Sequence, residues 1–122
     1  MDKSQAIDNF WKRFGLPAYD ENTVPDDAPL PRITYSVETD SLDGELSLTA
    51  SLWYRSKSWK DITQKAEDIG EYIVKMMPPT IPIDNGRLYI SKGSPFAQRM
   101  TDPDDSIRRI LLNINAEFLT AY

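Results

Sequence analysis

The chain has 122 residues, a length typical of one domain and short for two. It contains neither cysteine nor histidine, which excludes a disulfide framework, a thiolate zinc site and catalytic pairs built on a thiol or an imidazole. The formal net charge of −5 argues against broad binding to nucleic acid or to anionic membranes, since both need a basic surface.

No apolar run is long enough to span a bilayer, and the longest are as short as Ile110 to Leu112. The first residues lead into an amphipathic helix and lack the apolar stretch of a signal peptide. The absence of cysteine fits synthesis in a reducing cytoplasm. We therefore expect a soluble protein that is made in the cytoplasm.

Residues 4–14 predict a short helix with Ser4 as its N-cap, and Gly15 stands where a left-handed C-cap would end it. Its apolar side chains recur on one face, at Ile7, Phe10, Trp11 and Phe14. This stripe favours burial in the protein's own core over docking in a partner's groove.

Residues 16–31 predict a loop rich in proline and aspartate. From Tyr19 to Pro31 the chain holds three prolines and four acids without an apolar period. A loop of this length in a compact domain is usually functional or disordered.

Two alternating runs predict a β-hairpin. Apolar and polar residues alternate in 32–39 and again in 45–55, and Asp43-Gly44 is typical of a turn between them. The expected buried face of the second run is Leu46, Leu48, Ala50, Leu52 and Tyr54. Trp53 lies on the opposite, polar face, where it either meets the N-terminal helix or lies at an interface.

Residues 58–77 predict the main helix, which begins with capping-box spacing from Ser58 to Asp61. Its expected buried face is Ile62, Ala66, Ile69, Ile73 and Met76. Gly70 costs the helix about 1 kcal/mol relative to alanine, which indicates close packing on the sheet. Trp59, in the first turn, is open to the same two interpretations as Trp53.

The last third of the chain predicts further strands. A strand is expected at 87–92, after a possible short one at 81–83. Gly93-Ser94-Pro95 then indicates a turn, and residues 96–105 show no regular pattern. Residues 107–119 alternate with a period of two, which favours a long strand over a helix.

Together these elements predict a single α+β domain over residues 1–122, in the order α-β-β-α-β-β. Two hairpins joined across one helix give a four-stranded, mainly antiparallel sheet. The 58–77 helix is expected to cover one face of that sheet.

No motif with catalytic, cofactor or metal chemistry is found. The five glycines are too far apart for a phosphate-binding loop, and no serine stands three residues before a lysine. The acidic clusters fall in predicted turns, where solvated carboxylates are common. Asp102, Asp104 and Asp105 miss the calcium-loop spacing, so a turn before the last strand is the better interpretation. We expect no enzyme activity, no cofactor and no metal.

The sequence resembles a known family in several segments. These are Ile33 to Val37, Leu48 to Ser56, Ser58-Trp59, Ile62 to Glu71, Gly93 to Met100, and Asp102 to Arg109 with the closing strand. They resemble the tail-terminator and head–tail joining proteins, often called minor capsid proteins, of long-tailed bacteriophages and prophages. The resemblance covers most of the chain from residue 30 onward and the N-terminal helix.

The resemblance implies a small α+β subunit that closes into a six-membered ring. Such a ring caps the tail tube, stops its polymerisation and offers a docking surface to the head connector. The implied partners are other copies of the chain, the tail-tube protein and a head-completion or connector protein, with no membrane and no sequence-specific nucleic acid. The implied location is the tail or neck of the virion.

Six residues are candidates for the subunit or partner interface: Trp53, Arg55, Trp59, Phe96, Arg99 and Met100. The two tryptophans qualify because each either packs within the protein or lies at an interface. Residues 96–100 qualify because an apolar and basic segment in an irregular stretch is unusual unless it packs on something. The basic residues either balance charge at element ends or form salt bridges to a neighbouring subunit. The 19–31 loop and the 40–44 turn are candidates for contacts to the tube or the connector.

Three alternatives remain at this point. The chain could be another neck or connector protein of the same kind of particle, which size and element order do not separate from a terminator. It could be a small-ligand-binding domain or an enzyme, which would need a concave pocket with convergent polar groups. An acidic mimic of DNA ranks lowest, because the acids lie in turns instead of along one face.

Overall fold

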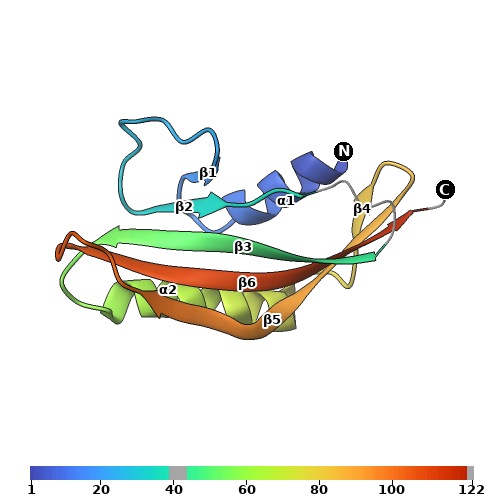
Figure 1. The fold of residues 1–122 in the computed structure, drawn as a ribbon. Coiled ribbons are helices and arrows are strands. Elements are labelled where there is room, and N and C mark those ends of the chain that lie inside the picture. The colour runs from blue at the N-terminus through green and yellow to red at the C-terminus, as the bar shows by residue number, and fades with distance from the viewer. Residues whose placement is uncertain (39–43, 121–122) are drawn as a thin grey trace.

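Two helices and six strands make up the described part of the chain, which comprises residues 1–38 and 44–120 of a computed structural model. Their order is α-β-β-β-α-β-β-β (Figure 1). The elements are α1 (Lys3–Lys12), β1 (Ala18–Asp20), β2 (Arg32–Tyr35), β3 (Gly44–Arg55), α2 (Lys60–Glu71) with its π-helical continuation η1 (Tyr72–Met76), β4 (Ile81–Ile83), β5 (Gly86–Met100) and β6 (Ile107–Thr120). The predicted turn at 40–44 lies outside the described residues, apart from Gly44 at the start of β3.

The predicted α-β-β-α-β-β order, with a four-stranded sheet and one main helix, is wrong. The strands form one curled six-stranded sheet in the order β1-β2-β3-β6-β5-β4. The sheet is mixed, because β1 runs parallel to β2 while the other neighbouring pairs are antiparallel. The edge strands β1 and β4 have three residues each, too few to show a period, and they join the sheet through backbone pairing.

Strand β5 is longer than its sequence predicts. The strand expected at 87–92 continues to Met100, so half of the segment predicted as irregular belongs to the sheet. The residues Gly93-Ser94-Pro95 do not turn the chain. They lie in a β-bulge, where the pairing between β5 and β6 shifts its register.

The alternation in β3 and β6 builds the core, and the strands predicted at 45–55 and 107–119 are confirmed. Leu48 lies opposite Ile114, and Leu52 lies opposite Ile110. These four side chains are at most 3% exposed. Since burying one such side chain contributes about 1.5–3 kcal/mol, this face carries much of the free energy of folding.

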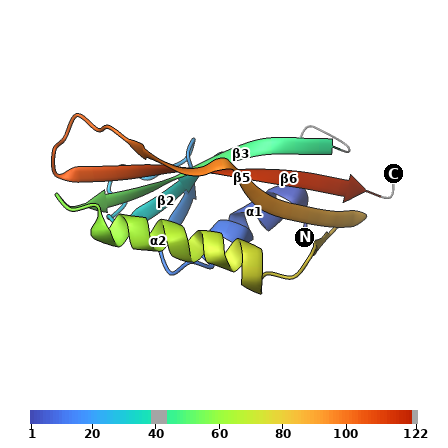
Figure 2. The same ribbon diagram turned by 90° about the horizontal axis from the view of Figure 1, so that it is seen from below.

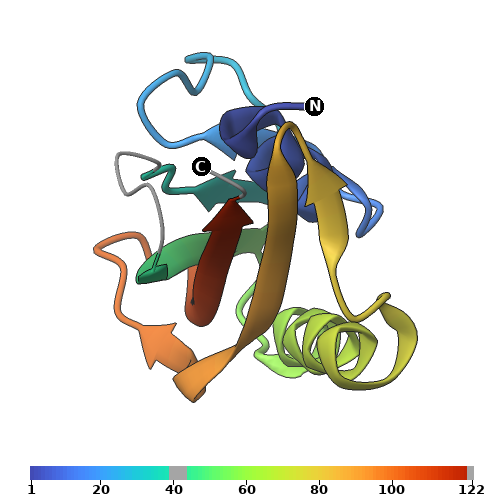
Figure 3. The same cartoon turned by 90° about the vertical axis from the view of Figure 1, so that its right-hand side faces the viewer.

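Both helices pack on the apolar face of the sheet, inside its curl (Figures 2 and 3). The buried helical side chains include Ile7, Phe10 and Trp11 of α1 and Ile62, Ala66 and Ile69 of α2. The segment after α1 touches the start of η1, since the rings of Phe14 and Tyr72 meet edge to face at 5.4 Å. The aromatic stripe of the N-terminal helix therefore packs in the protein's own core, as predicted.

The helix ends differ in detail from the prediction. Asp2, not Ser4, is the N-cap of α1, and its side chain forms a capping box with Gln5. Helix α2 starts one residue after Trp59 without a side-chain cap. Met76, predicted to be buried, is 69% exposed because the chain becomes π-helical at Tyr72 and the last turn rotates.

The opposite face of the sheet is polar, and neither helix covers it. Side chains on this face include Ser47, Thr49 and Ser51 of β3 and Asn113 and Asn115 of β6. The sheet is therefore one-sided, with a packed face and an open face.

An acid–tyrosine contact ties α1 to the sheet. The hydroxyl of Tyr35 in β2 donates to the carboxylate of Asp8, which also pairs with Lys12 at 2.7 Å. Burial alone would raise the pKa of Asp8, but the hydrogen bonds from Lys12 and Tyr35 outweigh it and hold the pKa below its ordinary value. Burial, followed by the bond to Asp8, raises the pKa of Tyr35.

Replacing Tyr35 by phenylalanine is expected to lower the free energy of unfolding by roughly 1–2 kcal/mol near neutral pH, because the charged Asp8 loses a hydrogen bond. Since the folded pKa of Asp8 is depressed, its contribution is present above the unfolded pKa of about 4 and is lost as the pH falls through the folded value. The difference between wild type and Tyr35→Phe should therefore shrink in acid. Urea unfolding as a function of pH measures both effects.

Tyr89→Phe is the matched control for that variant, because Tyr89 is 46% exposed on the open face. It should leave the urea midpoint unchanged across the pH range. Equal midpoints for Tyr35→Phe and wild type at neutral pH would show that the Asp8 contact does not stabilise the fold.

Candidate functional site

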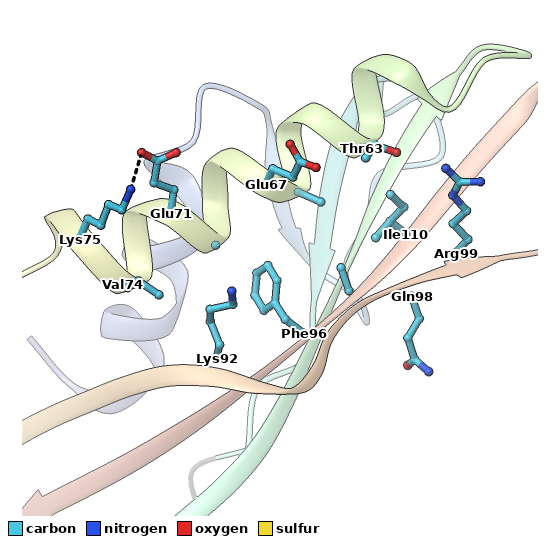
Figure 4. Close-up of a pocket in the computed structure, with 13 residues that line it drawn as sticks. Thr63, Glu67, Glu71, Val74, Lys75, Lys92, Phe96, Gln98, Arg99 and Ile110 are labelled. Atoms are coloured by element: carbon cyan, nitrogen blue, oxygen red, sulfur yellow. Dashed lines mark hydrogen bonds and ion pairs between the residues drawn. The ribbon is translucent and has the colours of Figure 1, made fainter.

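A groove of about 530 Å³ runs between helix α2 and the second half of strand β5 (Figure 4). Its helix wall comprises Thr63, Ala66, Glu67, Gly70, Glu71, Val74 and Lys75, and its sheet wall comprises Lys92, Phe96, Ala97, Gln98, Arg99 and Ile110. The bottom of the groove is mostly apolar, and charged side chains lie along its rims. Two of the predicted interface residues, Phe96 and Arg99, line it.

The bulge in β5 creates the groove. Within the bulge, the backbone at residue 93 approaches Asn113 of β6 so closely that only glycine fits. A Cβ on Gly93 would lie 2.8 Å from the carbonyl oxygen of Asn113. Beyond the bulge, residues 97–100 pair with β6 alone, since β4 covers only residues 86–88. The outer edge of this half of β5 is therefore free, and α2 faces it across the groove.

Phe96 stands in the middle of the groove and is half-buried against α2. A Cβ added to Gly70 would lie only 3.1 Å from Cε2 of this ring. The close packing predicted for Gly70 is confirmed, and its neighbour is the Phe96 ring on β5.

Two cations flank Phe96 on the sheet wall. The Nζ of Lys92 lies 5.1 Å from the centre of the Phe96 ring, and the Cζ of Arg99 lies 4.7 Å from a ring centre of Trp59. Within the described ranges neither cation forms an ion pair with a carboxylate. Lys92 and Arg99 are thus positioned by aromatic rings, and their positive charges can form ion pairs with a partner.

Trp59 lies next to the groove, where its ring meets the guanidinium of Arg99. Besides Arg99, it carries the guanidinium of Arg108, whose Cζ lies 5.4 Å from the ring centre. Arg108 in turn donates to the carbonyl oxygen of Lys57, which fixes the start of α2 against β6. Trp59 is therefore partly a structural residue, packed against the core on one side and stacked with arginine on another.

A second hollow, of about 560 Å³, lies on the open face at the β2 end of the sheet. Trp53 lines it, and its indole donates to the Thr34 hydroxyl at 2.9 Å. Arg32 and Arg109 flank the ring, with Cζ atoms 5.8 and 4.7 Å from its centre. Since α1 packs on the other face, Trp53 does not meet the N-terminal helix.

The six predicted interface residues fall into two groups. Trp59, Phe96 and Arg99 gather at the groove. Trp53 and Arg55 line the second hollow, and Met100 pairs with Arg109 next to Trp53 in the sheet.

Sequence reasoning missed two groove residues, Lys92 and Val74. Val74 is 67% exposed although it lies within an apolar helical pattern. Lys92 has an ordinary position at a strand end in the sequence, and only the bulge brings it beside Phe96. The position of Val74, an apolar residue outside the buried stripe of its helix, is the one sequence feature that could have indicated the groove.

In the acidic turn at Asp102–Asp105, two of the carboxylates accept hydrogen bonds from backbone amides of the same turn. Asp102 accepts from the amide of Asp104, and Asp104 accepts from the amide and hydroxyl of Ser106. The bonds from the Ser106 side chain and amide lower the pKa of Asp104. The predicted turn before the last strand is confirmed.

Residues 1–38 and 44–120 contain no group of three or more acidic side chains placed to hold a metal ion. In the same ranges, no helix has the length and apolar character needed to cross a membrane.

Comparison with known proteins gives one informative similarity. No protein-family model matches the chain, and no curated protein matches it by sequence. The fold is similar to that of a chain in a solved structure described as the virion of a native gene transfer agent particle. The TM-score is 0.63, the match covers 89% of this chain and 83% of that chain, and the sequence identity is 15%. The two chains therefore share a fold over nearly their whole lengths.

The contact between Gly70 and Phe96 predicts a coupled pair of substitutions. In a Phe96→Ala background, Gly70→Ala should stabilise the protein by about 1 kcal/mol, because alanine favours the helix and nothing opposes its methyl group. In the wild type, Gly70→Ala should stabilise the protein by less than this or destabilise it, since the Phe96 ring must move to admit the methyl group. A double-mutant cycle by urea unfolding measures the difference, and equal effects in both backgrounds would show that the ring does not press on Gly70.

Proposed function

We propose that this protein is a structural subunit of a phage-like particle, and more narrowly a tail terminator. In this role it forms a ring that caps the tail tube, stops tube growth and joins the tail to the head connector. The observation that carries the proposal is the shared fold with a chain of a gene transfer agent particle, over 89% of one chain and 83% of the other.

The surfaces of the subunit support an assembly role. A closed ring of identical copies uses a heterologous interface, in which one patch of each copy meets a different patch of the next. The chain has two different patches at opposite edges of its sheet: the groove beside β5 and the loop before β2. The resemblance of its sequence to tail terminators points to the same role.

The proposed partners follow from this role. They are further copies of the chain, with six as the expected ring size, the tail-tube protein and a head-completion or connector protein. The subunit acts by binding and has no catalytic step. It resides in the tail or neck of the virion, after synthesis in the cytoplasm of the bacterial host.

One observation favours a second candidate, a small-ligand-binding domain. The groove has the volume of a typical ligand site. Its rims, however, carry the Glu71–Lys75 pair and two cations that form no ion pair with any described residue, instead of polar groups that converge on one point. Such a rim suits a protein partner better than a small molecule.

The proposal is tested by the mass of the protein in solution and by electron microscopy, alone and with the tail-tube protein of the same genome. We expect rings, or tubes of uniform length that end in a ring, because a terminator stops polymerisation. The tube protein alone is the control and should give tubes of variable length. A chain that stays monomeric and leaves tube length uncontrolled would contradict the terminator role and favour a connector.

A further inference from the structure

We infer that the groove between α2 and β5 receives the acidic loop of a second copy of this chain, residues 20–31, and that this contact is the subunit interface of the ring. The inference rests on the proposed ring and names the two surfaces that close it. Four features of the loop, the groove and their placement support it.

The first is the charge of the loop. It carries the acids Asp20, Glu21, Asp26 and Asp27 and has no basic residue before Arg32. Glu21, Asp26 and Asp27 are exposed. Across the described residues none of these three carboxylates forms an ion pair. The protein thus presents a strongly negative projection whose charges are not neutralised within the subunit.

The second feature is that the loop is already shaped. The amide of Thr23 donates to the carbonyl of Asp20 at 2.9 Å, and the amide of Ala28 donates to that of Pro25 at 3.1 Å. Arg32 donates to the carbonyl of Ala28 at 2.9 Å and pins the far end. A loop held in this way loses little conformational entropy on docking, which favours its use as a recognition element.

The third feature is the chemistry of the groove. Lys92 and Arg99 are exposed, lack carboxylate partners among the described residues and flank the Phe96 ring. Ala97 and Val74 add apolar surface to the same groove. The loop supplies the complement, because acids alternate in it with Val24, Pro25, Pro29 and Leu30.

The fourth feature is the placement of the two surfaces. The loop joins β1 to β2 at one edge of the sheet, and the groove lies beside β5 near the other edge. Figure 3 shows the loop and α2 on opposite sides of the molecule. A patch at one side that fits a different patch at the other side is the requirement for a head-to-tail ring.

Addition of a neighbour's strand to the free edge of β5 is less well supported. This edge contains the bulge and Pro95, which lacks a backbone donor. Bulges and prolines are features that block pairing between exposed sheet edges. The groove is therefore suited to a loop with acidic and apolar side chains.

The test is a two-sided charge reversal. The loop variant is Asp26→Lys with Asp27→Lys, and the groove variant is Lys92→Glu with Arg99→Glu. The loop variant removes the net negative charge of the loop and sets lysines against the cations of the groove, and the groove variant gives the groove the negative sign of the loop. Self-association of each variant alone should therefore weaken by about tenfold or more. An equimolar mixture of the two should restore assembly, since the introduced lysines of one variant then meet the introduced glutamates of the other. Light scattering and electron microscopy, with tail-tube protein present, measure both effects.

The control reverses charges away from the loop and the groove, as Glu45→Lys on β3 with Arg87→Glu on β5, and should assemble like wild type. Cooperative urea unfolding shows that every variant is folded. Wild-type rings together with undiminished assembly of both variants, or no recovery on mixing, would overturn the inference while the terminator role stands. A wild-type chain that never associates with itself or caps tubes would overturn both.

Discussion

The fold depends on the match between the alternating patterns of β3 and β6. The two strands pair without interruption from Gly44 to Arg55. On the packed face, the apolar residues of 46–52 on β3 lie opposite the apolar residues of 110–116 on β6. A slip of one residue would turn the whole apolar set of one strand to the open face, so the register is strongly determined. With this register fixed, both helices have one face on which to bury their apolar stripes, and the other face stays polar.

The candidate site arises where β5 departs from this regular pattern. Up to Lys92 the strand follows β6 and contributes Leu88 and Ile90 to the core. At the bulge it changes register, and its next half places Phe96 against Gly70 and leaves a groove along α2. Two glycines make this possible, Gly93 by admitting the backbone of Asn113 and Gly70 by admitting the ring. The groove is thus built into the packing of helix on sheet, whereas the acidic loop at the other edge is held by its own hydrogen bonds.

The sequence predicts the elements in which a periodic pattern of apolar residues repeats over many residues. The alternation of 45–55 and 107–119 and the apolar stripe ending in Phe14 each span enough residues to identify a strand or a helix. The possible short strand at 81–83 is confirmed as β4, but the pattern fails for β1, whose three residues are placed by pairing with β2. It also fails for β5, because Gly93-Ser94-Pro95 has the composition of a turn and only the contact with Asn113 makes it a bulge. The candidate residues Trp59, Phe96 and Arg99 could be chosen from composition, but their meeting in one groove depends on that bulge.

We propose that this protein is a component of a phage-like particle, present as one ring for each tail. Quantitative mass spectrometry of purified particles from the host tests it most directly, by comparing the copies of this chain with those of the tail-tube protein. We predict a small, fixed number of copies per particle that does not change when the tail is lengthened or shortened, because a ring at the tube end is made once. Absence of the chain from purified particles, or a copy number that rises with tail length, would contradict the claim.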